Sequence, residues 1–260
     1  MPELFDIDNA DAPLFLIKHA AARHHFANSQ GLDIYHTFAT TSGPHPQPAG
    51  VANLEVANEI YLAPGSAIGP HLYHQTDVIM YMLAGTLEQD GELPFNTLTV
   101  GDVQLLSTGT GLLHGEHNPS MDQPAHFLRF WLQGTSHAPA VAMKHFALEQ
   151  KQAHLRLIAS PDAHHDTLKL HTQALIYACV LDIKQSVHHE FADNRVGYLY
   201  VARGSLSLTV SQGSQELNDE ILHTGDSGII SPSCRVEITC LDAAEFLLFE
   251  LPDYNHLVSI

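Results

Sequence analysis

Basic residues are scarce in this chain of 260 residues. Lysine and arginine together number 11 against 29 aspartates and glutamates, which gives a formal net charge of −18 at pH 7. A surface that binds nucleic acid needs a basic patch, so we expect no direct nucleic-acid partner. The same balance disfavours binding to an anionic membrane and to highly anionic substrates.

Cysteine and long apolar runs are also lacking. The three cysteines, Cys179, Cys234 and Cys240, form no Cys-x-x-Cys motif, and each lies in an apolar, strand-like stretch. We therefore expect reduced core thiols in a cytoplasmic protein. No stretch reaches the ~18 consecutive apolar residues of a membrane span. The N-terminus has neither the basic nor the apolar region of a signal peptide, so we expect no membrane association.

The chain does contain regularly spaced apolar segments separated by turn residues. Hydrophobic residues make up 45% of the sequence and charged residues 15%, which is enough to build sizeable cores. The Asp90-Gly91-Glu92 step is a hairpin signal between two such segments. The pattern predicts an all-β protein with strands at 51–62, 78–89, 95–106 and 126–133.

Side chains able to bind a metal gather on two of these segments. His114 and Glu116 are two residues apart, so on an extended chain both point to the same face. Imidazole and carboxylate together suit a divalent transition metal. His71 precedes the apolar run 78–83, and a small antiparallel barrel would bring it close to His114.

A weak internal repeat predicts two related barrels. The pattern Tyr-x-x-x-Gly at Tyr81 recurs at Tyr200, and the Gly-Asp turn at Gly101 recurs at Gly225. We expect an N-terminal barrel at 14–133, a linker with a short helix at 134–159, and a C-terminal barrel at 160–260. The positions that match His71 and His114 are Glu190 and Ile238, so we expect the second barrel to be structural.

The two motifs resemble those of the pirin family of bicupins. The first motif of that family reads His-x-His-x-x-x-Glu, and the second contains Gln, Gly-x-Gly and His-x-Glu. This chain has His71-Leu-Tyr73 and then, after Gly101, Gln104, Gly109-Thr-Gly111 and His114-Gly-Glu116. The likeness extends from about residue 17 to 253. It implies two cupin barrels of the double-stranded β-helix, jelly-roll type, with a metal site in the first formed by His71, Tyr73, His114 and Glu116.

One position departs from the family pattern. The second histidine of the first motif is Tyr73 here, and a histidine follows one residue late, at His74. A tyrosine binds a divalent ion poorly, because its phenol has a pKa near 10. Three options stay open: Tyr73 ligates, His74 replaces it through a β-bulge, or the site is weakened or empty. We favour the last.

The resemblance implies a dioxygenase that acts on a flavonol-type aromatic substrate, as quercetinases do. Its cofactor would be one divalent transition metal, with iron favoured over nickel, manganese, copper or zinc, or none if Tyr73 has emptied the site. Glu116 would then be the catalytic proton acceptor. The alternative is a non-enzymatic pirin-like binding or regulatory protein, with a protein partner. A third option is different metal chemistry on the same barrel, such as sugar isomerisation or hydrolysis.

Overall fold

The computed structural model describes residues 13–38, 50–90, 97–134 and 137–253, and strands dominate it. The predicted turn at Asp90-Gly91-Glu92 lies largely outside the described residues, but the strands on either side of it pair antiparallel. Three short helical segments occur among the described residues: η1 (Ala20–Ala22), α1 (Leu148–Lys151) and η2 (His164–Asp166). None of the helices among these residues has the length and apolar character that a membrane span requires.

The first half of the chain forms two facing sheets. The seven-stranded sheet has the order β12-β9-β6-β11-β4-β3-β2, and the four-stranded sheet has the order β5-β10-β7-β8. The larger sheet consists of β2 (His24–Ala27), β3 (Leu32–Phe38), β4 (Leu54–Leu62), β6 (Thr76–Ala84), β9 (Asp102–Ser107), β11 (Ala125–Gln133) and β12 (Ala140–His145). The smaller sheet consists of β5 (Ala67–Tyr73), β7 (Thr86–Gln89), β8 (Thr97–Thr99) and β10 (Leu112–His117).

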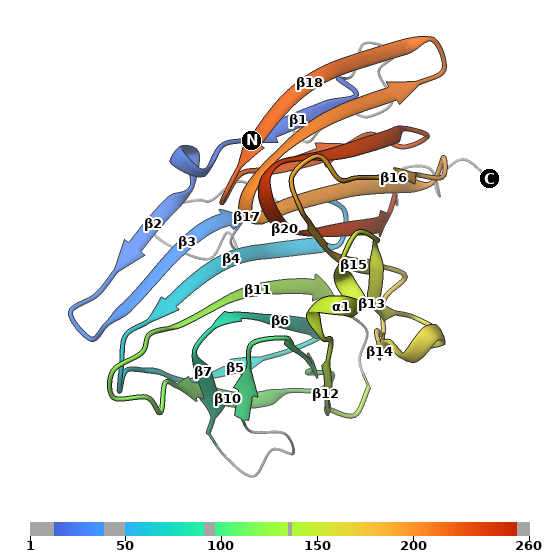
Figure 1. The fold of residues 1–260 in the computed structure, drawn as a ribbon. Coiled ribbons are helices and arrows are strands. Elements are labelled where there is room, and N and C mark those ends of the chain that lie inside the picture. Colours follow the sequence, from blue (N-terminus) through green and yellow to red (C-terminus); the bar gives the residue numbers. More distant parts are fainter. Residues whose placement is uncertain (1–12, 39–49, 91–96, 135–136, 254–260) are drawn as a thin grey trace.

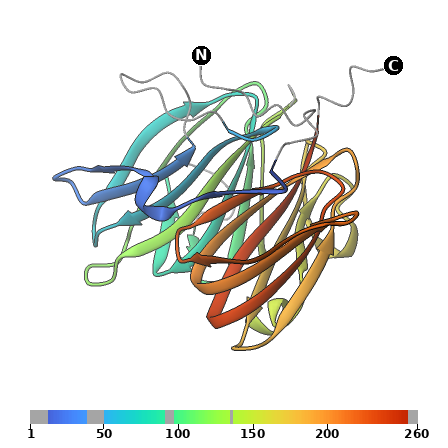
Figure 2. The same cartoon turned by 90° about the horizontal axis from the view of Figure 1, so that it is seen from above.

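The second half forms a nine-stranded sheet that curls on itself, because its two longest strands contribute to both faces. Its members are β1 (Phe15–Lys18), β13 (Arg156–Ser160), β14 (Leu168–Lys169), β15 (Leu175–Leu181), β16 (Ser186–Glu190), β17 (Arg195–Gln212), β18 (Gln215–His223), β19 (Ser227–Ile230) and β20 (Arg235–Pro252). The two halves lie side by side, the first in blue and green and the second in orange and red (Figure 2). The predicted all-β fold with two cupin barrels is confirmed.

Alternation along the central strands explains how the halves join. In β6, Met80 packs inside the N-terminal barrel, whereas its neighbours Ile79 and Tyr81 pack in a core shared with the other half. In β17, Leu199 packs inside the C-terminal barrel and Tyr200 in the same shared core. A strand that is buried on both faces has a continuous apolar sequence, which is why residues 78–83 do not alternate between apolar and polar.

The two tyrosines of the repeat each reach across this shared core. Tyr81 donates a hydrogen bond to Glu245 of the second half at 2.5 Å, and Lys151 donates to both. Tyr200 of the second half likewise donates a hydrogen bond to Glu59 of the first half, and Arg23 donates to both. The sequence repeat is therefore a structural repeat, in which each tyrosine makes a hydrogen bond to a glutamate of the other half.

Two segments lie differently from the sequence-based expectation. β1, which we placed with the first barrel, pairs antiparallel with β19 in the sheet of the second half (Figure 1). The linker contains α1 as expected, but it also contains β12, which pairs with β9 along its whole length. Val141 and Met143 of β12 alternate onto the barrel core, a period of two that favours a strand over a helix.

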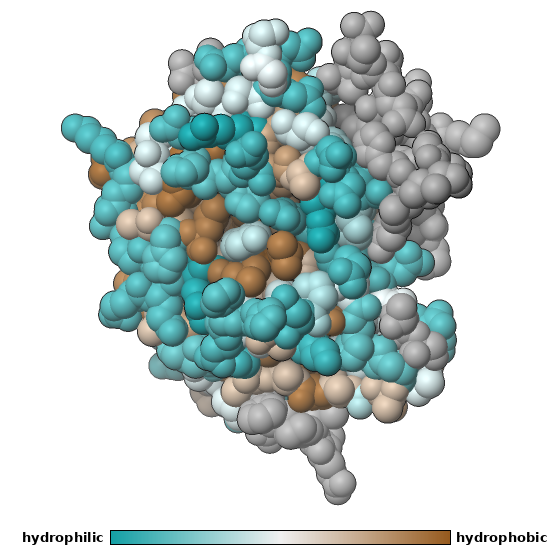
Figure 3. Space-filling view, turned by 90° about the vertical axis from the view of Figure 1, so that its right-hand side faces the viewer, coloured by the Kyte–Doolittle hydropathy of each residue, from teal (hydrophilic) through white to brown (hydrophobic). Residues whose placement is uncertain are grey.

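The surface on the side of α1, β13 and β14 is largely hydrophilic, in keeping with the acidic composition. Apolar side chains gather in the middle of this face, within a polar surround (Figure 3).

The three cysteines are not part of the surface: all are free and buried. Burial raises the pKa of Cys179 to about 12, so its thiol stays protonated and inert at neutral pH.

Candidate functional site

The pairing of β5 with β10 brings the two predicted clusters together. His71 lies directly opposite His114 in this antiparallel ladder. The next pair joins Glu116 to Ile68, so β5 holds one extra residue between the two pairs. That bulge falls at Gly69 and Pro70, where proline offers no backbone donor to the ladder. Because the extra residue is in β5, β10 keeps its alternation, and His114 and Glu116 face the same interior side.

Four predicted residues meet at this point, and the fifth does not. His71 Nε2 contacts the Tyr73 hydroxyl, and the rings of His71 and His114 lie 6.3 Å apart. His114 Nε2 lies 3.1 Å from Glu116 Oε1. His74 is exposed and lies beyond the end of β5. The bulge in β5 therefore occurs before the motif and not at His74, so the structure brings Tyr73, rather than His74, to the other three.

The structure adds Arg129, which we did not predict from the sequence. Its Nη1 atom donates to both oxygens of Glu116, at 3.0 and 3.1 Å, and to the Tyr73 hydroxyl at 3.1 Å. Arg129 and Glu116 are both almost completely buried. A buried arginine must have an anionic partner, because an isolated charge is costly to remove from water.

The signal for Arg129 was present in β11. Phe127 of this strand packs in the core of the N-terminal barrel and Trp131 packs against that core, whereas Phe130 packs in the shared core. Arg129 has the same parity as Phe127 and Trp131, so strict alternation places it inside the barrel. A single arginine at an interior position of an apolar strand indicates a buried ion pair, and Glu116 was the candidate carboxylate.

The electrostatics of the cluster follow from burial and this ion pair. Burial by itself would raise the pKa of Glu116, but Arg129, with His114 and His71, lowers it to about 2. Burial raises the pKa of Tyr73 above its ordinary value, although Arg129 opposes the shift. Burial also lowers the pKa of His71. At neutral pH the cluster thus contains an ionised Glu116, a charged Arg129 and a neutral phenol at Tyr73.

This arrangement does not fit a divalent metal at the position that the family resemblance implies. The Arg129 guanidinium already occupies both oxygens of Glu116, and a second cation would compete for them. Tyr73 is a neutral phenol and therefore a weak ligand. Within the described part of the chain, one group of three His, Cys, Asp or Glu residues has ligand atoms that all lie within 4.8 Å, and it is elsewhere.

Several buried polar atoms of the cluster lack a hydrogen-bond partner. They are His114 Nδ1, Arg129 Nε and Trp131 Nε1. The Trp131 ring meets the Tyr73 ring edge to face, with centroids 5.0 Å apart. Buried polar groups are normally paired, so unpaired groups on one cluster indicate a place for a polar ligand or ordered water.

Comparison with known proteins places these observations in a family. Residues 19–132 match the pirin family model, and residues 157–251 match the model of the quercetinase C-terminal cupin domain. Quercetin 2,3-dioxygenase from Escherichia coli (strain K12) is 30% identical over 244 residues, which cover 92% of this chain and 99% of that protein. The chain belongs to the pirin family.

Other pirin-family proteins support the same assignment. The pirin-like protein YhaK from Escherichia coli (strain K12) is 29% identical over 85% of this chain and 92% of its own length. A crystal structure of the bacterial pirin YhhW from Escherichia coli in complex with nickel(II) matches with a TM-score of 0.81 and 28% identity, covering 92% of this chain and 99% of that chain. The family fold thus holds a transition metal in at least one relative.

Proposed function

We propose that this pirin-family chain is a binding protein for a small hydroxylated aromatic molecule, and that Arg129 takes the place of the family metal in its N-terminal barrel. The observation that carries the proposal is the contact of the Arg129 guanidinium with Glu116 and Tyr73. This corresponds to the alternative that the sequence left open, a non-enzymatic pirin-like protein with a degenerate metal site.

Charge supports this reading of the site. The negative charge of Glu116 is balanced here by a fixed side chain, Arg129. Hydrogen bonds between an arginine and an ionised carboxylate are stronger than those between neutral groups. Displacing the guanidinium would leave Arg129 buried without a partner, at a cost of about 3–5 kcal/mol. A metal would have to supply that free energy in addition to its own dehydration.

The chemistry of the ligand is inferred from the groups around the ion pair. The Tyr73 and Trp131 rings lie beside the ion pair, and His114 Nδ1, Arg129 Nε and Trp131 Nε1 are unpaired. A polyphenol supplies both an aromatic plane and hydroxyl groups that donate and accept. The similarity to proteins named quercetin 2,3-dioxygenase supports a flavonol such as quercetin as the probe.

The first experiment uses the single tryptophan of the chain as a reporter. Quercetin is titrated into tag-free protein, and Trp131 fluorescence is followed with correction for absorption by the flavonol. We expect saturable quenching in the wild type and its loss in Tyr73→Ala. Arg235→Gln is the matched control, because it removes an exposed arginine of the second half and should bind as the wild type does. Quenching that does not saturate would overturn the ligand assignment.

A second candidate function is a metal-dependent dioxygenase, favoured by a similarity that extends over nearly the whole chain. Metal content by mass spectrometry and oxygen uptake with quercetin separate the two. We expect no metal whose binding depends on His114, and no oxygen uptake, in the wild type. About one metal ion per chain that is lost in His114→Ala, together with oxygen uptake, would establish the dioxygenase instead. Arg129→Gln, which removes the competing charge, should raise metal content if our account of the site is right.

A further inference from the structure

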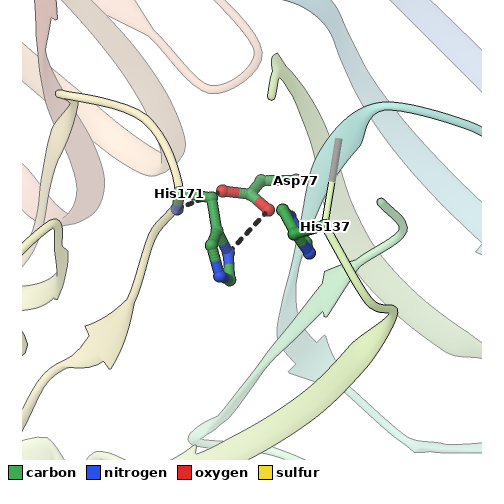
Figure 4. Close-up of side chains that lie close together, drawn as sticks. All are labelled: Asp77, His137 and His171. Carbon is green, nitrogen blue, oxygen red and sulfur yellow. Dashed lines mark hydrogen bonds and ion pairs between the residues drawn. The ribbon is translucent and has the colours of Figure 1, made fainter. Parts of the chain in front are cut away.

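A second cluster of metal-binding side chains lies where the two halves meet. Asp77 begins β6 of the first half, His137 lies between β11 and β12, and His171 follows β14 of the second half. Figure 4 shows the three side chains converging, with the Asp77 carboxylate directed toward His171 and His137 beside it. In the pirin resemblance Asp77 matches a supporting acid of the first motif, but here it contacts the other half of the chain and not Glu116.

The side chains of the cluster are close enough together to hold one ion. The ligand atoms of the three residues all lie within 4.8 Å of one another. Asp77 Oδ1 lies 3.6 Å from His171 Nδ1. The His137 and His171 rings are stacked, with centroids 3.7 Å apart and planes at 22°. Because an imidazole lone pair lies in the plane of its ring, the two stacked rings must turn apart for both nitrogens to face one ion.

A second observation points to a missing ligand. Asp77 is completely buried, and its Oδ1 atom has no hydrogen-bond partner. Its other oxygen, Oδ2, accepts from the backbone N–H of His171 at 2.7 Å. A carboxyl group buried with one oxygen unpaired is costly unless a cation or donor completes it. The unpaired oxygen is directed at the two histidines.

The surroundings hold each donor in place. His137 Nδ1 donates to the carbonyl of Ala138 at 2.7 Å, which leaves the lone pair on Nε2 for a metal. His171 Nδ1 lies 3.1 Å from the Ser107 hydroxyl, which can rotate to accept or donate. The carbonyl of His137 accepts from the Thr110 N–H at 3.0 Å, which anchors the backbone of this segment.

We propose that Asp77, His137 and His171 form a binding site for a divalent transition metal, with zinc as the best-matched ion, that cross-links the two halves of the chain. One carboxylate and two imidazoles are a donor set that zinc accepts, with a fourth position open to water. Because the ligands come from both halves, the ion binds the assembled fold and not the unfolded chain, so it stabilises the junction. The site is separate from the Arg129 cluster and does not rest on the proposed function.

The test is a titration of chelator-treated, tag-free protein with zinc alone, by calorimetry and by thermal unfolding. We expect about one zinc ion per chain and a rise in Tm. His137→Phe keeps the stacked ring but removes the ligand, and Asp77→Asn keeps the acceptor for the His171 N–H but removes the charge. Changes to groups that only support a ligand cost about 10–100-fold in affinity, so loss of a ligand should weaken zinc binding by ~100-fold or more.

Two control variants make the outcome decisive. His114→Ala removes the histidine of the other cluster, and His164→Ala removes an exposed histidine of the second half. Both should bind zinc as tightly as the wild type. Cobalt in place of zinc should give visible absorption that is lost in His137→Phe. Absence of zinc binding by the wild type would overturn the proposal, as would equal affinity in the wild type and the two ligand variants.

Discussion

The two barrels have the same strands around different interiors. In the first, His114 lies opposite His71; in the second, Ile238 lies opposite Val187. Arg129 pairs with Met80, and the equivalent pair in the second barrel is Leu248 with Leu199. A charged cluster in one barrel is therefore matched by aliphatic packing in the other.

The difference teaches that the barrel does not need the polar cluster for its fold. The second interior is completed by buried aliphatic, aromatic and cysteine side chains, including Leu248, Ile238 and Cys240. A buried ion pair is seldom more stabilising than well-packed apolar residues of similar volume. The cluster of the first barrel is thus better explained by binding than by stability.

The largest effect on stability should come from placing an arginine in the apolar interior of the second barrel. Leu248→Arg places a guanidinium in a fully buried position without the carboxylate that Arg129 has. We expect a loss of more than about 5 kcal/mol, comparable to the whole stability of many domains, and no folded product. Soluble yield and near-UV circular dichroism measure this. Leu241→Arg, at an exposed position of the same strand, should fold normally. A folded Leu248→Arg protein would show that this interior tolerates charge.

The next effect comes from removing the partner of Arg129. Glu116→Ala leaves the guanidinium buried and uncompensated, so the free energy of unfolding should fall by about 3–5 kcal/mol in urea denaturation. Glu237→Ala, an exposed glutamate of β20, should change it by less than ~0.5 kcal/mol.

A double variant sharpens this result. Glu116→Leu combined with Arg129→Leu imitates the second barrel and should be as stable as the wild type, or more stable by up to ~4 kcal/mol. If the double variant is as unstable as Glu116→Ala, the cost lies in lost packing and not in the unpaired charge.

Acid should weaken the first barrel more than the second. The pKa of Glu116 falls from 4.5 to about 2 in the folded protein, so its ionised form favours folding above pH 4.5. As pH decreases from 4.5 to about 2 this stabilisation is lost, on the order of 3 kcal/mol. Glu59, whose pKa is also about 2, titrates in the same window in every variant. Urea midpoints measured against pH should fall less steeply in the Glu116→Leu, Arg129→Leu double variant. Parallel curves for the two proteins would contradict the assignment.

The smallest effect concerns the apolar counterpart of His114. Ile238→Val removes one methylene from a fully buried position and should cost about 0.5–1.5 kcal/mol in urea denaturation. Ile221→Val, at an exposed position, is the control and should be close to neutral. An equal effect at both positions would show that the second interior is loosely packed and that the comparison of the two barrels overstates its order.

Local patterns predicted much of this molecule. The apolar runs predicted the central strands because a strand buried on both faces is mostly apolar, as residues 78–83 of β6 are. The repeat of Tyr81 at Tyr200 predicted two barrels, and Gly85 and Gly204 show why it persists. Both have positive φ, and a Cβ atom at either would lie within 2.3 Å of a backbone carbonyl oxygen, that of Pro124 or Ala243. Only glycine fits there.

Those local patterns could not predict which strands pair when they are far apart in the sequence. The Ala- and Gln-rich linker was expected to form a short helix, but part of it forms β12 because it pairs with β9. β1 joined the sheet of the second half because β19 offered an edge, which no local signal reveals. The partners of Asp77 were hidden for the same reason, since His171 is distant in sequence and belongs to the other half.

The sequence by itself determined that the chain is acidic, all-β and duplicated, and that His71, Tyr73, His114 and Glu116 belong to one motif pair. Those properties follow from the composition and from patterns within single strands, where residues two apart face the same side. Only the tertiary structure decided that Arg129 enters the motif and that two histidines meet Asp77 between the halves. Such meetings depend on the register of strands far apart in sequence, and the free energy of burying a charge selects the partner only once the barrel is closed.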